Sequence, residues 1–259
     1  MKSGILQVVG IGPGNYDMMT VQCVKALKDC DCIIGYDVYI DLVKEHFPDK
    51  EFKSTPMRKE EERCRLAVEE ALSGKNVALI CSGDAGVYGM SGLAFEIAAE
   101  YEASRPDEKI QISVIPGITA ALSGSALLGA PLIHDFAVIS LSDLMTPWEK
   151  IEKRLDLASK ADFCVVLYNP MSHKRKDYLF KACQIMAKNI SETTPCAYVK
   201  NIGRKGEEFK ILTLKELSVS ELDMFCTVFI GNSQTKIIEV NGQKQLVTPR
   251  GYVFERGEK

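Results

Sequence analysis

The chain has 259 residues, of which 46% are hydrophobic and 26% are charged, and it contains no low-complexity stretch. This composition is typical of a folded globular protein, and the length can bury one large core or two modest ones. The formal net charge of −3 gives no general positive field, which argues against nucleic acid and anionic membrane surfaces as partners.

The first half of the chain alternates short apolar runs with amphipathic segments. Strands are predicted at 5–9, 32–34, 77–81 and 110–115, where apolar runs end near glycine, serine or proline. Helices are predicted at 63–72 and 93–101, where apolar residues recur at three-and-four spacing. Because parallel strands need long crossovers, this alternation favours a mostly parallel sheet covered by helices.

A segment of small residues then leads into a second alternation. Thr119 is the expected N-cap of a tightly packed helix, which Gly129-Ala130-Pro131 ends. Further strands are predicted at 136–140, 163–167, 196–199 and 228–231, and further helices at 148–158 and 178–187.

No repeat of fixed period joins the two halves, so we predict an α/β protein with two different α/β domains and a cleft between them. The expected boundaries are 1–116 for the N-terminal domain, 117–242 for the C-terminal domain and 243–259 for a polar C-terminal tail.

Three glycine-containing loops follow predicted strands, at 10–14, 82–88 and 116–119. Ligands of α/β proteins bind outside the carboxyl ends of the strands, so these loops predict a small-molecule site. A dinucleotide site fits only in part, because Asn15 stands where its third glycine belongs, and a purely structural turn stays open. A phosphate-binding loop is excluded, because Lys75 is followed by Asn76 and lacks the upstream glycine.

Individual polar residues offer chemistry, and each has a structural alternative. Asp84 is interpreted as a helix cap or as the partner of a ligand's ammonium group. Arg175 and Arg250 lie beside turn residues and could bind a polycarboxylate, although basic clusters are more often solvated faces. His46, His134 and His173 show no ligand spacing, and no Gly-x-Ser-x-Gly motif supports a hydrolase.

The cysteines bear on metal content and location. Nine cysteines lie singly, without the paired spacing of zinc or iron–sulfur sites, and several fall inside apolar runs. We therefore expect reduced, structural cysteines and no metal site. Since no apolar run approaches the roughly 18 residues that a membrane helix needs, a cytoplasmic protein without a membrane partner is expected.

The ordered set 9–14, 82–84, 116–120 and 168–170 resembles the class III S-adenosylmethionine-dependent methyltransferases of tetrapyrrole biosynthesis. Within that family, 134–149 and 168–172 are similar to the enzymes that methylate carbon 17 of a corrin precursor. The resemblance implies the two-domain tetrapyrrole methylase fold in a homodimer, with S-adenosylmethionine in the cleft and a tetrapyrrole above it.

The same resemblance implies a reaction. The methyl group goes to carbon 17 of cobalt-factor III or precorrin-3B, coupled to contraction of the macrocycle, in cobalamin (vitamin B12) biosynthesis. Two alternatives stay open: a related corrin methyltransferase that acts at another carbon, and a non-catalytic tetrapyrrole-binding protein.

The family motifs imply positions for the cofactor. Gly83, Asp84 and Val87 would line its methionine half, with Asp84 near the amino group. Thr119 and Ala120 would flank the sulfonium and ribose, Asn169 would lie near the adenosine, and Leu212 would offer backbone contact to adenine.

For the substrate, the loop at Gly12, Pro13 and Gly14 would border the tetrapyrrole, and Arg250 is a candidate for its carboxylates. Asn15 replaces an aspartate that several relatives carry as a candidate base, so the base is unassigned. Ser142 and Asp143 are the hypothesised catalytic groups that polarise an oxygen during ring contraction, with Arg175 holding a carboxylate. The cysteine-bearing extension of some longer relatives is lacking, so no iron–sulfur cluster is expected.

Overall fold

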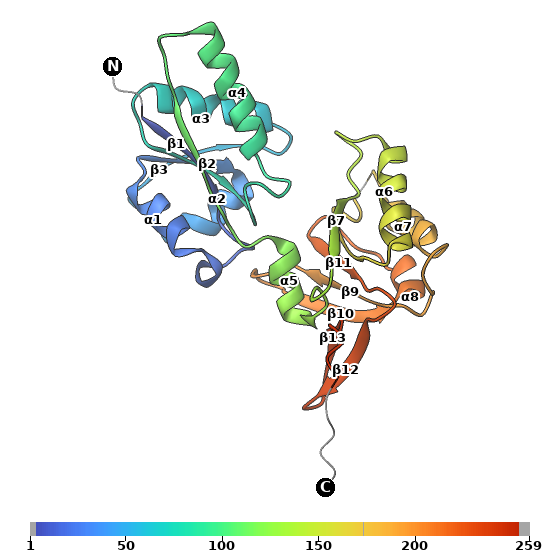
Figure 1. Cartoon of the computed structure of the whole chain (residues 1–259). Coiled ribbons are helices and arrows are strands. Elements are labelled where there is room, and N and C mark those ends of the chain that lie inside the picture. The colour runs from blue at the N-terminus through green and yellow to red at the C-terminus, as the bar shows by residue number, and fades with distance from the viewer. Residues whose placement is uncertain (1–3, 173, 254–259) are drawn as a thin grey trace. The chain divides into compact units, whose positions relative to one another are not determined.

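The computed structural model describes residues 4–172 and 174–253. His173 and residues 254–259 of the expected tail lie outside this part. The chain divides into two units, Met1–Ala120 and Ala121–Lys259 (Figure 1). The division falls four residues later than expected, because the amide of Gly117 donates a hydrogen bond to the Asp84 carboxylate and so keeps the third glycine loop with unit 1.

Unit 1 is built on a five-stranded parallel sheet in the order β3-β2-β4-β1-β5. Its strands are β1 (Ile5–Gly10), β2 (Cys32–Tyr36), β3 (Glu51–Thr55), β4 (Val77–Cys81) and β5 (Gln111–Ile115). Its helices are α1 (Val21–Asp29), α2 (Asp37–Val43), α3 (Glu60–Leu72) and α4 (Ser91–Ser104), and a 3-10 turn, η1 (Tyr16–Met18), follows β1. The predicted parallel sheet is confirmed.

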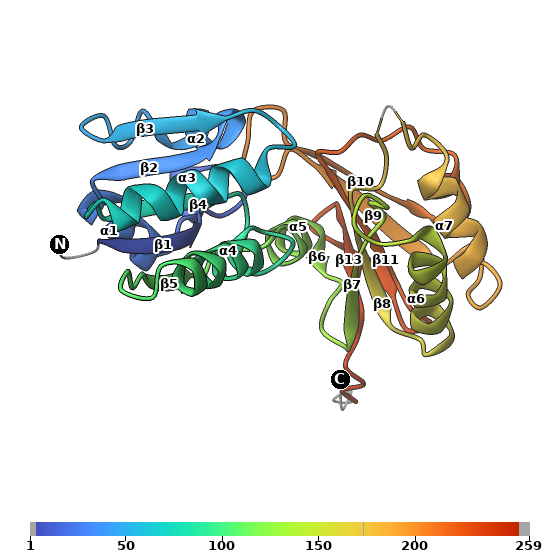
Figure 2. The same ribbon diagram turned by 90° about the horizontal axis from the view of Figure 1, so that it is seen from above.

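Both faces of this sheet are covered, as Figure 2 shows. Val8 and Leu79 pack in a cluster with α3 and α4, whereas Val9 and Ile80 pack with α1 and α2. Strands buried on both faces form continuous apolar runs, which is why the sequence located the central strands. The edge strand β3, which carries Glu51 and Lys53, was not predicted, because it lacks such a run.

Unit 2 has a mixed five-stranded sheet in the order β10-β9-β11-β8-β7. The strands are β7 (Phe136–Ser140), β8 (Cys164–Tyr168), β9 (Pro195–Lys200), β10 (Glu208–Thr213) and β11 (Cys226–Ile230). Strands β7 and β8 are parallel, and the other pairs are antiparallel. The four strands and two helices predicted for this half after residue 131 are confirmed, whereas β10 had no counterpart among the expected elements.

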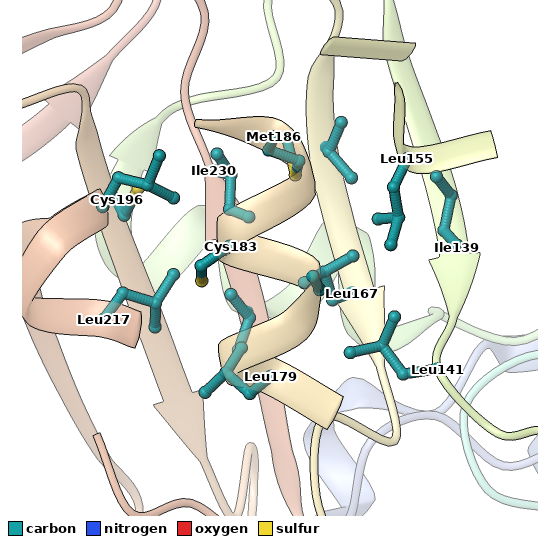
Figure 3. Packing of buried hydrophobic residues seen from close by; sticks show 14 of the residues in the cluster. Ile139, Leu141, Leu155, Leu167, Leu179, Cys183, Met186, Cys196, Leu217 and Ile230 are labelled. Atoms are coloured by element: carbon teal, nitrogen blue, oxygen red, sulfur yellow. The ribbon is translucent and has the colours of Figure 1, made fainter. Parts of the chain in front are cut away.

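The helices of unit 2 lie on both faces of its sheet. Helices α6 (Trp148–Lys160), α7 (Tyr178–Met186) and α8 (Leu214–Ser218) cover one face, where Leu155, Leu179 and Leu217 meet Leu167 and Ile230 of the strands (Figure 3). Helix α5 (Ala120–Leu128) begins directly after Thr119, at the position expected from an N-cap. A Cβ atom on its Gly124 would lie 2.8 Å from the ring of Phe229, so this helix packs closely on the sheet.

The C-terminal tail was predicted to begin at residue 243, but a strand begins there, so the predicted start of the tail is wrong. Strands β12 (Lys236–Val240) and β13 (Gln243–Val247) form a hairpin, and β13 also pairs with β6 (Gly129–Ala130). The turn residues Asn241 and Gly242 have φ values of 52° and 76°, as a two-residue type I′ turn requires. All of β12 is exposed, so hydrophobic alternation could not reveal it, although the Asn-Gly pair is a hairpin signal.

Close backbone packing joins the three glycine loops of unit 1. A Cβ atom on Gly117 would lie 2.1 Å from the carbonyl oxygen of Gly83 and 2.6 Å from that of Gly10. Gly12 and Gly83 exchange hydrogen bonds of 3.1 and 2.7 Å, and Gly12 has φ of +75°. The glycines therefore let one backbone approach another, rather than leaving space for a phosphate.

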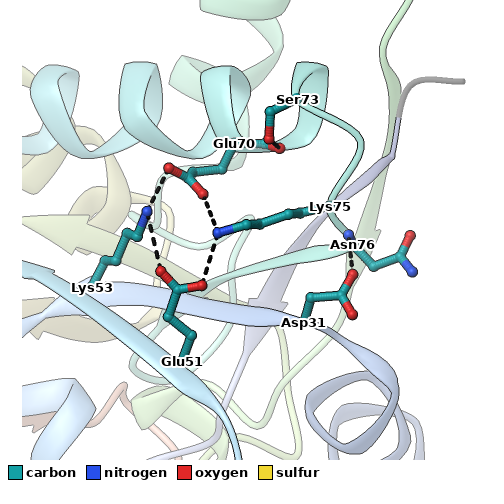
Figure 4. Close-up of polar contacts among 7 residues, drawn as sticks. All are labelled: Asp31, Glu51, Lys53, Glu70, Ser73, Lys75 and Asn76. Carbon is teal, nitrogen blue, oxygen red and sulfur yellow. Dashed lines mark hydrogen bonds and ion pairs between the residues drawn. The ribbon is translucent and has the colours of Figure 1, made fainter. Parts of the chain in front are cut away.

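Four charged side chains form a closed ring of ion pairs in unit 1 (Figure 4). Lys75 lies 2.8 Å from both Glu51 and Glu70, and Lys53 contacts the same two carboxylates. Hydrogen bonds from Lys53 and then Lys75 lower the pKa of the Glu70 carboxyl. The ring ties β3 to the end of α3 and to the segment before β4.

Replacing Gly117 with alanine should destabilise unit 1 by roughly 1–3 kcal/mol, the usual effect of forcing an atom into packed structure. Urea unfolding checks this through the midpoint of the transition. Gly92→Ala is the matched control, because a Cβ atom there meets nothing within 4 Å. Equal midpoints for the two variants would contradict the packing argument.

Glu70→Gln should lower Tm by roughly 2–4 °C, since a network of this kind contributes about 1 kcal/mol. The folded-state pKa of Glu70 is lowered, so its contribution is present above the ordinary value of 4.5 and disappears as the pH falls through the folded-state pKa. Thermal unfolding as a function of pH should therefore show the two proteins converging in acid. Glu62→Gln, which removes an exposed pair with Lys59, should change Tm little at any pH.

Candidate functional site

The Asp84 carboxylate ties two loops of unit 1 together. One oxygen accepts a hydrogen bond from the amide of Gly86 at 2.8 Å, and the other accepts one from Gly117 at 2.9 Å. Helix α4 starts only at Ser91 and has Met90 at its N-cap position, so the helix-cap interpretation of Asp84 is wrong. Each carboxylate oxygen can accept a further hydrogen bond, and contact with a ligand's ammonium group stays a prediction.

The cofactor residues predicted from separate parts of unit 1 lie side by side. A Cβ atom on Gly83 would be 3.6 Å from the Cα atom of Thr119 and 3.8 Å from the amide nitrogen of Ala120. Val87 is 37% exposed, and its neighbour Tyr88 has φ of +54°. A non-glycine residue with positive φ is strained, and such strain clusters at functional sites.

The first glycine loop, at 10–14, is more buried in unit 1 than contact with a substrate requires. Gly12 and Pro13 are buried, and both backbone groups of Gly12 are hydrogen-bonded to Gly83. Gly14 is half-buried. Pro13 and Gly14 therefore remain the candidates in this loop for the predicted contact with the tetrapyrrole. The side chain of Asn15 accepts a hydrogen bond from the amide of Met18 and caps η1, which gives this departure from the family pattern a structural role.

The three predicted catalytic residues converge in unit 2, although 32 or more residues separate Arg175 from the other two in the chain. Strands β7 and β8 run parallel, so the loops that follow them start at the same edge of the sheet. Nη1 of Arg175 donates a hydrogen bond of 2.6 Å to Oγ of Ser142 and lies 3.4 Å from Oδ1 of Asp143. Nε of Arg175 donates to Oγ of Ser172 at 3.2 Å.

Tyr178, which the sequence analysis did not single out, completes this group. Its hydroxyl donates a hydrogen bond of 2.6 Å to Oδ2 of Asp143. This bond and, secondarily, those from Arg175 lower the pKa of the Asp143 carboxyl, which is therefore charged at neutral pH and unsuited to act as a general acid. The sequence offered one signal for Tyr178: this residue lies three positions after Arg175, at the start of a predicted helix.

The remaining predicted residues of unit 2 have different surroundings. Asn169 has φ of +53°, and its amide donates a hydrogen bond of 3.0 Å to Oγ of Ser140. Leu212 lies on the edge strand β10 with its side chain buried in the core, so only its backbone could meet a ligand. Arg250 is exposed, two residues beyond the buried Thr248, whose hydroxyl donates to the carbonyl of Pro131 at 2.7 Å.

The cysteines are buried and free, and burial raises the pKa of Cys81, which precedes the second loop, to about 11. Its thiol is therefore neutral and a weak nucleophile. Across residues 4–172 and 174–253, no three His, Cys, Asp or Glu side chains gather closely enough to hold a metal ion. In the same part of the chain, no helix combines the length and apolar character needed to cross a membrane.

Three curated relatives resemble the whole chain in sequence. It is 44% identical to a probable cobalt-factor III C(17)-methyltransferase of Salmonella typhimurium, over 96% of this chain and 100% of that protein. It is 42% identical to a cobalt-factor III methyltransferase of Priestia megaterium, of which it spans 45%. It is 36% identical to a precorrin-3B C(17)-methyltransferase of Sinorhizobium, over 96% of this chain and 98% of that protein.

Solved structures agree with these relatives. The crystal structure of the methyltransferase CobJ superposes with a TM-score of 0.84 at 31% identity and covers 95% of this chain and 100% of its own. A uroporphyrin-III C-methyltransferase of Thermus thermophilus, complexed with S-adenosyl homocysteine, shares the fold with a TM-score of 0.68, covering 88% of this chain and 92% of its own.

The family model for tetrapyrrole (corrin/porphyrin) methylases matches residues 6–218. This match and the full-length relatives confirm the resemblance drawn from the loop motifs, and with it the predicted fold. The chain belongs to the tetrapyrrole methylase family.

Proposed function

We propose that this protein transfers a methyl group from S-adenosylmethionine to carbon 17 of a corrin precursor and contracts the macrocycle, in cobalamin biosynthesis. The likeness to a C(17)-methyltransferase over that protein's entire length carries this proposal. The convergence of Ser142, Asp143 and Arg175 supports it, because Ser142 and Asp143 come from a segment similar to the carbon-17 enzymes and Arg175 lies three residues after the other such segment.

Cobalt-factor III is the proposed substrate. The two relatives named for the cobalt-containing substrate are 44% and 42% identical to this chain, whereas the relative named for precorrin-3B is 36% identical. A homodimer in the cytoplasm is also proposed, on the family resemblance.

The residues of unit 1 fit the methionine part of the cofactor. Asp84 holds a carboxylate between two loops with hydrogen-bonding capacity to spare, which suits an ammonium group. Gly83 and Val87 would line the methionine half with Asp84, and Thr119 and Ala120 would flank the sulfonium and ribose. In unit 2, Asn169 is proposed to contact the adenosine, and the backbone of Leu212 its adenine.

When bound, S-adenosylmethionine would supply an activated methyl group for transfer to the substrate carbon. The protein's contribution to that step is to position the substrate carbon in line, which can account for roughly 7–11 kcal/mol of the barrier. The preformed loops of unit 1 suit this task, because their close backbone packing leaves little freedom to move.

The substrate's carboxylates would be held by arginines. Nη1 and Nε of Arg175 already donate to Ser142, Asp143 and Ser172, whereas Nη2 reaches no acceptor within the described residues. That nitrogen can donate to a substrate carboxylate without breaking the internal contacts. Arg250, together with Pro13 and Gly14, completes the proposed substrate contacts.

Anaerobic incubation of the purified protein with S-adenosylmethionine and cobalt-factor III should add one methyl group to the pigment, as measured by mass spectrometry. Precorrin-3B, tested in parallel, should react more slowly. NMR of the isolated product should place the new methyl on carbon 17, and another position would favour the alternative corrin methyltransferase. Binding of both ligands without methyl transfer would favour a tetrapyrrole-binding protein instead.

Asp84→Asn should weaken S-adenosylmethionine binding roughly tenfold to a hundredfold, because a hydrogen-bonded charge on a ligand contributes about 1.5–3 kcal/mol. Calorimetric titration measures the affinity. The control ligand is 5′-methylthioadenosine, which lacks the amino acid part and should bind both proteins alike. Equal losses for the two ligands would mean that the substitution disturbs the loops and that the ammonium contact is absent.

A further inference from the structure

We propose that Tyr178 is a positioning residue for the ring-contraction step. Tyr178 fixes Asp143, and Asp143 in turn holds Arg175. Arg175 then leaves the Ser142 hydroxyl as a hydrogen-bond donor toward an oxygen of the substrate. This inference rests on the proposed function and adds to it a residue that neither the motifs nor the compared names assign.

The side chain of Tyr178 is held rigidly by its neighbours. Its ring lies 4.3 Å from the ring of Trp148, centroid to centroid, and the indole nitrogen of Trp148 donates a hydrogen bond of 2.6 Å to Glu152. The Lys181 ammonium lies 5.4 Å from the centre of the Tyr178 ring. The phenol therefore has a defined direction, and its hydroxyl points at Oδ2 of Asp143.

On the opposite side of the Asp143 carboxylate, Arg175 makes a longer contact. Oδ1 of Asp143 faces Nη1 of Arg175 at 3.4 Å, which is longer than a strong charge-assisted hydrogen bond. The short contact from Tyr178 is thus the tighter of the two restraints on Asp143. Removing the phenol hydroxyl would leave the carboxylate free to turn and would loosen the guanidinium that faces it.

Arg175 in turn fixes the hydroxyl group of Ser142. A guanidinium is only a donor, so Oγ of Ser142 accepts the 2.6 Å hydrogen bond from Arg175 and must direct its own proton elsewhere. Within residues 4–172 and 174–253, that hydroxyl donates to no other group. A hydroxyl whose lone pair is held by a cation is a stronger donor, which suits an oxygen that gains negative charge during the reaction.

The titratable and charged groups that face Asp143 in the described structure are Tyr178 on α7 and Arg175 before it. Asp177 and Lys181 are further charged groups near the tyrosine. Tyr178 is the main cause that lowers the pKa of Asp143, so its removal should raise that pKa toward the ordinary aspartate value.

The test follows both half-reactions in Tyr178→Phe, with methyl transfer measured by mass spectrometry and contraction by the visible absorption of the macrocycle. The contraction kcat should fall roughly tenfold to a hundredfold, the usual effect of losing a hydrogen bond to a charged group. The methyl-transfer rate and the KM for the pigment should stay unchanged. The acid limb of the contraction rate should move to higher pH, because protonation of Asp143 then begins earlier.

Two further variants make the result specific. Tyr101→Phe is the matched control: that hydroxyl also donates a 2.6 Å hydrogen bond to a carboxylate, Glu69, but between α3 and α4 of unit 1. It should change neither half-reaction. Tyr178→Phe combined with Asp143→Asn should be no slower than Asp143→Asn alone, since Tyr178 acts through Asp143.

The inference is overturned if Tyr178→Phe contracts the ring at the normal rate with an unmoved acid limb. It is equally overturned if the substitution lowers both half-reactions and Tm together, which would indicate a purely structural role. Should the unmodified protein methylate neither pigment, the proposed function itself would fall, so the two failures are distinguishable.

Discussion

The constraint on which the site of unit 1 depends is the close approach of three backbone segments at one edge of the parallel sheet. Gly10 and Gly117 leave no room for a Cβ atom between the loops, and the Asp84 carboxylate accepts a hydrogen bond from the amide of Gly117. The exits of β1, β4 and β5 are thereby joined into one rigid surface. Thr119 and Ala120 are placed beside Gly83 as a consequence.

In unit 2, side chains join the loops at two strand exits, whereas backbone packing does so in unit 1. Strands β7 and β8 are parallel, and the loops after them are cross-linked by Arg175, which bonds to Ser142, Asp143 and Ser172. Asp84 and Asp143 both accept two hydrogen bonds, but those to Asp84 come from backbone amides and those to Asp143 from side chains. The first arrangement fixes the shape of a loop, whereas the second leaves polar atoms that can face a substrate.

Several sequence interpretations changed once the structure assigned each residue its neighbours. The helix-cap role of Asp84 failed, because its loop is closed by Gly86 and Gly117 and α4 begins seven residues later, at Ser91. Gly12 proved to be a backbone partner of Gly83. The expected tail became β13, because strand pairing with β6 and β12 supplies stability that local hydrophobicity does not show.

From the residues alone we predicted the central strands, helices α3 to α7 and the family, because strands buried on both faces leave continuous apolar runs and glycine loops leave ordered motifs. Helices α1 and α2 were not among the predicted elements. The sequence also selected Ser142, Asp143 and Arg175, although from resemblance rather than from geometry. The tertiary structure was needed to find that these residues meet, that Tyr178 donates a hydrogen bond to Asp143, and that the edge strands β3 and β12 exist. The contacts of Asp143 join residues far apart in the chain, which no local pattern records, and β3 and β12 lack the apolar patterns by which strands are predicted.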